Sequence, residues 1–208
     1  MVLTGHVIEA AAAPPHFMEL PQHNLTLCSP PDIYVNFRLR FPKDRVNEWA
    51  ARYGDAMDDA VPSSIGPVAR QRGHLLREEF LALTRWKSPR TQPRCAENTP
   101  EFIEAVTRVA LSTSSEQLGI QVLTLLRGVA WPTASVILHF CATRPYPVLD
   151  FRALWSLSCD AEATDYDFGL WQAYVTATRS LATECGVSMR TLDRALWAYS
   201  KVRQRVGT

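Results

Sequence analysis

The chain has 208 residues, of which 47% are hydrophobic, and its formal net charge at pH 7 is +1. This length fits one domain or two small lobes, and the hydrophobic share is normal for a globular core. The near-zero net charge excludes a protein that binds polyanions over its whole surface. Residues 70–94 nevertheless contain seven Lys and Arg side chains against two Glu. This segment is either a phosphate-facing patch or a solvated helix face, and charge alone favours the second interpretation.

The cysteines are odd in number and widely spaced, with no Cys-x-x-Cys pair. This spacing argues against a disulfide framework, a zinc knuckle and an iron–sulfur site, so we expect no metal site built from side chains. The first basic side chain is Arg38, so a secretory signal is not predicted. No run of residues is long and apolar enough to span a bilayer. We therefore expect a cytoplasmic protein without a membrane partner.

Residues 1–43 are predicted to form an N-terminal arm with a small β element. Apolar side chains alternate there with polar ones, at Ile33, Val35, Phe37, Leu39 and Phe41. A period of two is typical of a strand. Because one strand does not stand alone, we expect Leu25 and Leu27 to supply its partner across a Ser-Pro-Pro-Asp turn.

Residues 44–208 are predicted to form a helical domain. Apolar spacing and capping residues indicate helices over about 44–57, 75–85, 98–111, 116–126, 132–141, 151–158, 167–185 and 188–204. A break is predicted at residues 62–67, which begin and end with proline. Asn98 and Ser188 are predicted N-caps. The expected class is mostly α with a small β element near the N-terminus.

The most informative stretch joins two helices by Arg127-Gly-Val-Ala-Trp131 and then reaches a lone carboxylate, Asp150. Gly128 can take the positive φ that reverses the chain. Unpaired amides at the start of the second helix, together with Thr133 in its first turn, attract phosphate. From the residues alone, the simpler interpretation is a plain helix–helix turn in which Asp150 only caps the next helix.

This stretch resembles the helix-hairpin-helix DNA glycosylase superfamily, the endonuclease-III-like and adenine-glycosylase-like enzymes. Leu126-Arg-Gly-Val-Ala-Trp-Pro-Thr-Ala134 is similar to their Leu-x-Gly-Val-Gly-x-x-Thr-Ala signature. Asp150 follows Gly128 by 22 positions, the usual distance to their catalytic aspartate. The match covers about residues 116–158. It implies a two-lobed helical fold and a double-stranded DNA partner, from which a damaged or modified base is flipped out and removed.

The resemblance also implies roles for the matched residues. Asp150 is the catalytic residue, whose carboxylate stabilises positive charge on the sugar and orients or deprotonates the attacking water. Contacts to the DNA backbone are expected from the hairpin residues Arg127, Gly128, Val129, Ala130 and Thr133.

The loop after the first core helix often fills the gap left by a flipped nucleotide in relatives. Here Lys87 and Arg90 are candidates for phosphate contacts. Trp86, Gln92 and Trp131 are candidates for the base pocket or the wedge. Packing in the protein core is an equally good interpretation for the two tryptophans.

The sequence departs from the family pattern in three ways. Pro132 stands where bifunctional relatives carry an attacking lysine, which implies a monofunctional enzyme without strand cleavage. Nothing in the sequence places Lys87 or Lys201 nearby as a substitute. Ala130 replaces the second hairpin glycine, so a monovalent cation on the hairpin carbonyls is the one cofactor left open. The four-cysteine cluster of many relatives is absent from the sequence.

Three functions are therefore weighed. The first is a monofunctional DNA N-glycosylase that leaves an abasic site, in base excision repair or in defence against phage DNA with modified bases. The second is a non-catalytic helix-hairpin-helix DNA-binding protein. The third is a protein-interaction domain with an accidental hairpin, which the spacing from Gly128 to Asp150 disfavours.

Overall fold

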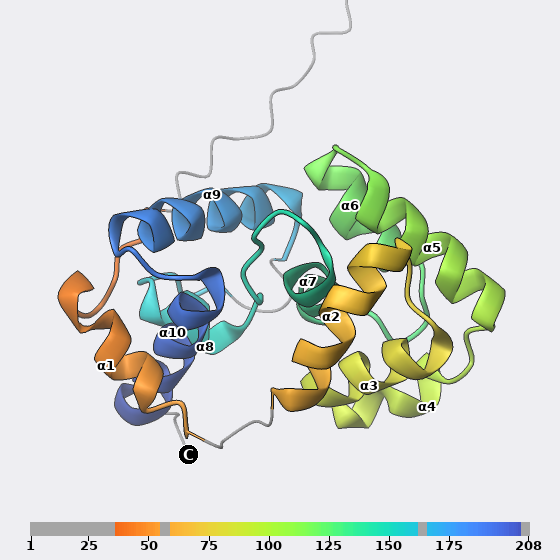
Figure 1. Cartoon of the computed structure of the whole chain (residues 1–208). Coiled ribbons are helices and arrows are strands. Elements are labelled where there is room, and N and C mark those ends of the chain that lie inside the picture. The colour runs from red at the N-terminus through yellow and green to blue at the C-terminus, as the bar shows by residue number, and fades with distance from the viewer. Residues whose placement is uncertain (1–35, 55–58, 162–165, 205–208) are drawn as a thin grey trace, which may run out of the picture. The chain divides into compact units, whose positions relative to one another are not determined.

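The computed structural model describes residues 36–54, 59–161 and 166–204, all within a compact unit, Ile33–Thr208. These residues are mostly helical and form no strand, so the predicted helical class is confirmed (Figure 1). The α-helices are α1 (Val46–Ala51), α2 (Ala60–Arg72), α3 (Arg77–Lys87), α4 (Gln92–Cys95), α5 (Pro100–Ser112), α6 (Glu116–Leu123), α7 (Trp131–Cys141), α8 (Phe151–Ser156), α9 (Phe168–Glu184) and α10 (Met189–Arg203). Short 3₁₀ turns cover Lys43–Arg45 and Pro89–Thr91.

The helices pack as two sets (Figure 1). In one set, α7 contacts α2, α3, α5 and α6. In the other, α10 contacts α1, α8 and α9, so the first helix packs with the last three. Helices α6 and α9 also contact each other. A hydrophobic core runs through both sets, with Phe80, Trp171 and Tyr174 among its largest fully buried side chains.

The alternation that predicted an N-terminal strand produces an extended segment without a sheet partner over its described residues. The N–H groups of Arg38 and Arg40 donate to the carbonyls of Leu157 and Ser156 at 2.9 Å, at the end of α8. Phe37 packs on the core, whereas both arginines are exposed. The alternation of apolar and polar residues thus reflects a segment with one face packed on the core. Its backbone pairs with the end of α8 where a second strand was expected. The predicted partner strand lies outside the described residues.

Helix α2 contradicts the break predicted between its two prolines. Pro62 lies in the first turn, where its missing N–H needs no partner, and Pro67 removes only one internal donor. Gly66 brings the helix directly against the backbone carbonyl of Phe140 in α7, where a Cβ would overlap it. This packing outweighs the helix-breaking tendency of the prolines.

Candidate functional site

The hairpin between α6 and α7 has the predicted glycine geometry. Gly128 has φ +81°, the left-handed region that favours glycine. A Cβ at this position would lie 2.7 Å from the Sγ of Cys95 and 2.9 Å from its backbone nitrogen. Val129 is buried in the core. The hairpin is therefore pressed closely against α4, and only glycine fits its turn.

Asn98 anchors the hairpin and does not cap a helix as predicted. Its buried Nδ2 donates to the carbonyls of Cys95 at 2.9 Å and Arg127 at 3.0 Å, and its Oδ1 accepts from the N–H of Arg127 at 2.9 Å. The cap of α5 is Thr99, whose hydroxyl accepts from the N–H of Phe102. Residue types near position 98 do not predict this role, because it depends on a contact 29 residues away.

Helix α7 begins without a side-chain cap. Its N-cap residue, Ala130, is exposed, and Pro132 occupies the first turn. Thr133 is buried to 4% exposure, and its N–H donates back to the carbonyl of Ala130 at 2.9 Å. The N–H of Ala134 donates to the same carbonyl and Pro132 has no N–H, so residues 132–134 do not supply the unpaired amides that the sequence predicts, and the helix dipole is what this end offers an anion.

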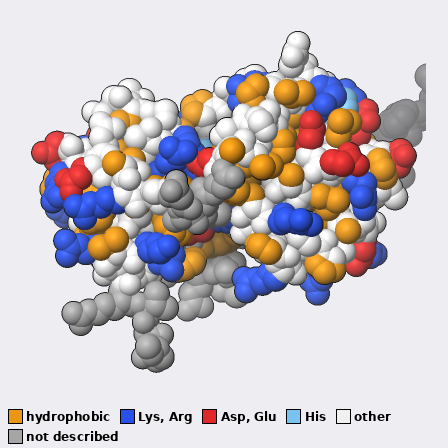
Figure 2. Space-filling view, turned by 60° about the horizontal axis from the view of Figure 1, so that its bottom comes forward, with side chains coloured by type: hydrophobic (Ala, Val, Ile, Leu, Met, Phe, Trp, Pro, Cys, Tyr) orange, Lys and Arg blue, Asp and Glu red, His pale blue; other side chains and the backbone are white. Residues whose placement is uncertain are grey.

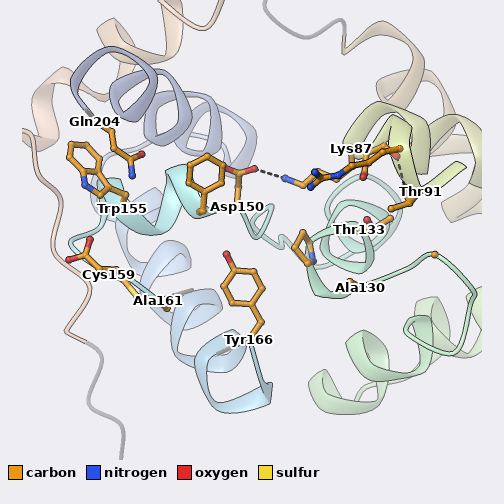
Figure 3. Close-up of a pocket in the computed structure, with 16 residues that line it drawn as sticks. Lys87, Thr91, Ala130, Thr133, Asp150, Trp155, Cys159, Ala161, Tyr166 and Gln204 are labelled. Carbon is orange, nitrogen blue, oxygen red and sulfur yellow. Dashed lines mark hydrogen bonds and ion pairs between the residues drawn. The ribbon is translucent and has the colours of Figure 1, made fainter. Parts of the chain in front are cut away.

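Asp150 makes two contacts that fix its carboxylate. Its Oδ1 accepts from the N–H of Arg152 at 2.9 Å, which makes Asp150 the N-cap of α8. Its Oδ2 accepts from the Nζ of Lys87 at 2.6 Å, drawn as a dashed line in Figure 3. The two side chains are 18% and 12% exposed. The expectation that nothing places Lys87 near the aspartate is therefore wrong, because the end of α3 brings it there.

Lys87 and Asp150 line a cleft of about 750 Å³ (Figure 3). The remaining lining comes from the turn after α3 (Ser88, Arg90, Thr91), the hairpin and start of α7 (Gly128, Ala130, Pro132, Thr133) and the α8 side (Phe151, Trp155, Cys159, Asp160, Ala161, Tyr166, Gln204). The cleft thus brings together six of the predicted site residues: Lys87, Arg90, Gly128, Ala130, Thr133 and Asp150.

The other predicted site residues lie outside the lining of this cleft. Arg127 is exposed and forms an ion pair with Glu97, and Val129 is part of the core. Trp131 is partly buried against the core, as its packing interpretation expects.

Gln92 and Trp86 are likewise absent from the lining of this cleft. The Nε2 of Gln92 donates to the hydroxyl of Thr84 at 2.8 Å, which holds this side chain back from a wedge position. Trp86 packs edge-to-face on Phe140, with the ring centroids 5.5 Å apart.

The basic segment 70–94 does not form a continuous patch. Four of its seven cations bond within the chain: Arg70 to the Phe140 carbonyl, Arg72 to Glu79, Arg77 to the Ala96 carbonyl, and Lys87 to Asp150. Arg85, Arg90 and Arg94 are exposed. Figure 2 likewise shows Lys and Arg side chains scattered over the face in view, between hydrophobic ones.

A second, smaller cavity of about 180 Å³ shares Lys87 and Asp150 with the cleft. Its other lining residues are Tyr53, Trp86, Val148, Ala153, Arg190, Asp193 and Trp197. Sequence reasoning missed the contribution of α10. The available signal was the spacing of Arg190, Asp193 and Trp197, which places all three on one helix face.

An ionic network holds α10 beside this cavity. Arg190 donates to Asp59 at 2.6 and 2.9 Å and to the Oδ2 of Asp193. Its guanidinium lies 5.2 Å from the ring centre of Tyr53 and 5.4 Å from that of Trp86. Burial disfavours the charge of Arg190, but the neighbouring carboxylates outweigh it and raise its pKa above the ordinary value.

Among the described residues, no three His, Cys, Asp or Glu side chains gather in a way that could bind a metal ion. A cation on the hairpin carbonyls stays a prediction. The described helices include none with the length and hydrophobicity needed to cross a bilayer.

Comparison with family models, curated proteins and solved structures gives no match to the chain. The resemblance to helix-hairpin-helix glycosylases therefore rests on the motif in residues 116–158.

His139 lies in α7 and gives the fold a testable pH dependence. Its Nδ1 lies 2.6 Å from the carbonyl of Tyr146, and Asp193 and Arg190 face it from α10. Burial lowers its pKa below 6.5, with Asp193 opposing and Arg190 reinforcing this shift. As the pH falls below 6.5, the unfolded chain therefore binds a proton before the folded one does. Stability is lost at up to about 1.4 kcal/mol per pH unit until the folded pKa is reached.

His139→Asn keeps an N–H donor near the Nδ1 position and does not titrate in this range. We expect urea unfolding, followed by circular dichroism from pH 7.5 to 5.5, to show a steeper loss of stability in the wild type than in this variant. Parallel profiles would show that His139 is not held neutral by the fold.

Proposed function

We propose that the chain is a monofunctional DNA N-glycosylase, in which Asp150 is the catalytic residue and water is the nucleophile. The observation that carries this proposal is the shared cleft. Gly128, Ala130 and Thr133 line it from the hairpin side, and Asp150 lines it from the start of α8. The two walls belong to different sets of helices, as the two-lobed glycosylase-like arrangement requires. A chance hairpin followed by a chance carboxylate has no reason to face one cleft.

The chemistry follows from charge. When the N-glycosidic bond breaks, its electron pair leaves with the base and positive charge develops on the sugar ring. A carboxylate beside the anomeric carbon stabilises that charge. Water then adds to this carbon and loses a proton, which leaves an abasic site. The amide of Arg152 holds the Asp150 carboxylate in place for this role.

Lys87 opposes this role in the free protein, because its ammonium group neutralises Asp150. Lys87 also lines the cleft beside Arg90 and the hairpin, where a DNA backbone offers phosphate oxygens. We therefore assign Lys87 to the backbone contacts. On DNA binding its ammonium moves from the carboxylate to a phosphate, and Asp150 becomes free to face the sugar.

Lys87→Gln is expected to weaken DNA binding and to reduce the slope of log K against log salt by about one. The measurement is fluorescence anisotropy with a labelled duplex at several salt concentrations. Lys43→Gln is the matched control, because Lys43 is exposed, forms an ion pair with Glu184 at the end of α9, and lines neither the cleft nor the second cavity. Equal slopes for the two variants would remove Lys87 from the DNA interface.

The function itself is tested with a panel of duplexes, each with one damaged or modified base, followed by alkali to cut abasic sites. The proposal predicts base release without cleavage before alkali, and no adduct after borohydride. A trapped adduct that disappears in Lys87→Gln would identify its amine as the nucleophile instead of water. No release from any duplex would overturn the glycosylase assignment.

A non-catalytic DNA-binding protein is the second candidate. It is favoured by the two contacts of Asp150, since a helix cap and an ion pair give this carboxylate a structural role without chemistry.

Under the proposed function the target is a damaged base in base excision repair or a modified base in phage DNA. We propose that the protein acts in the cytoplasm, on double-stranded DNA.

A further inference from the structure

The second cavity adjoins the cleft at two shared lining residues. Among the described residues, only Lys87 and Asp150 line both spaces, so the proposed catalytic carboxylate marks the boundary between them. A sugar held at this boundary would direct its phosphates along the cleft and its base into the smaller cavity.

The size and walls of the cavity suit a single base. Its volume of about 180 Å³ is below the roughly 300 Å³ at which pockets for drug-sized ligands begin. The aromatic side chains of Tyr53, Trp86 and Trp197 line it. Aromatic faces stack on nucleobases and gain about 1–3 kcal/mol per base.

Asp193 places a carboxylate in the wall of this cavity. Its side chain is only 8% exposed and lines the cavity. Within the described part of the chain, Asp193 accepts one hydrogen bond, from Arg190 to Oδ2, so Oδ1 and the second lone pair of Oδ2 are left for the donors of a ligand. Arg190 is itself held by Asp59, Tyr53 and Asp193. The cavity therefore offers a base an acceptor, with the neighbouring guanidinium already engaged.

The chemistry of base edges decides which leaving group fits. An ionised carboxylate only accepts hydrogen bonds, and it binds two adjacent donors with both oxygens. The Watson–Crick edge of a guanine-type base has adjacent N1–H and N2–H donors. Adenine and cytosine types place one amino group beside an acceptor nitrogen. Uracil types flank one N–H with two carbonyl oxygens, which a carboxylate repels.

We infer that this cavity is the base site, and that Asp193 is a specificity residue selecting a leaving base with the two-donor edge of guanine. The inference rests on the proposed function, since it names the class of base that the same site releases. In this proposal Asp193 determines which base binds, whereas Asp150 promotes cleavage of the N-glycosidic bond.

The test compares single-turnover release from matched duplexes that differ only in the 2-amino group. The pairs are 8-oxoguanine with 8-oxohypoxanthine and 7-methylguanine with 7-methylhypoxanthine, and a uracil duplex is included. We expect the wild type to prefer the 2-amino member by about tenfold or more, the worth of one hydrogen bond to a charged group. Asp193→Asn should lose this preference, because its amide presents one donor and one acceptor. Asp193→Glu, which keeps the carboxylate, should retain the preference at a lower rate.

Folding is checked by the affinity of each variant for a duplex with a tetrahydrofuran abasic site, which has no base to read and should bind equally well. Relative rates unchanged in Asp193→Asn, or a wild-type preference for uracil, would overturn the inference and leave the glycosylase assignment intact. Release of no base by the wild type would instead overturn the proposed function, and the inference with it.

Discussion

Replacing Asp150 by asparagine is expected to slow base release by about 100- to 10,000-fold, the range for a positioned acid–base group. DNA affinity should be retained or slightly tighter, because Lys87 loses its internal partner and is free for phosphate. Asparagine still offers an oxygen to the amide of Arg152, so the cap of α8 is kept and only the charge is lost. The measurements are single-turnover release and anisotropy on the best duplex of the panel.

Asp150→Ala is the companion variant, because it removes the cap together with the charge. We expect it to lower the free energy of unfolding by about 1 kcal/mol relative to Asp150→Asn, the usual worth of an N-cap, while both variants lose release. Wild-type release rates in Asp150→Asn would assign this carboxylate to the cap alone and favour the non-catalytic candidate.

A non-glycine residue in the left-handed region usually costs about 1–3 kcal/mol. We expect Gly128→Ala to lower the free energy of unfolding by more than this amount. The excess arises because the new Cβ would overlap Cys95, at 2.7 Å from its Sγ and 2.9 Å from its nitrogen. Relieving this overlap moves the hairpin away from α4, so DNA binding should weaken as well. Urea unfolding and anisotropy measure the two effects.

Gly73→Ala is the matched control. Gly73 has nearly the same backbone angle, φ +83°, but no atom lies within 4 Å of its added Cβ. It reports the backbone strain alone, and it lies outside the lining of the cleft. If both variants lose the same stability, the close packing of the hairpin on α4 contributes nothing.

Neighbouring residue types were sufficient to predict the hairpin and the first residues of most helices. The left-handed glycine at position 128, the buried valine beside it and the Ser188 cap all follow from neighbouring residue types. The position of Asp150 directly before a helix likewise indicates a cap role, which the structure shows.

The remaining features depend on packing between distant segments, which no local pattern determines. Lys87 reaches Asp150 because α3 ends near the start of α8, 63 residues later in the chain. Neighbouring residue types predict a cap at Asn98, because its actual partner, Arg127, is remote in the chain. The spacing of Arg190 and Asp193 is consistent with one helix face, but it does not indicate which residues that face contacts.

The central claim is that Asp150 stabilises positive charge on a deoxyribose held in the cleft, and it can be measured without knowing the base. Two duplexes are compared by anisotropy, one with a neutral tetrahydrofuran abasic site and one with a cationic pyrrolidine in its place. Transition-state mimics bind about 100-fold or more tightly than ground-state ligands. We expect the wild type to prefer the cationic duplex by at least about this factor, and Asp150→Asn to bind both equally. Equal affinity of the wild-type protein for the two duplexes would contradict the account.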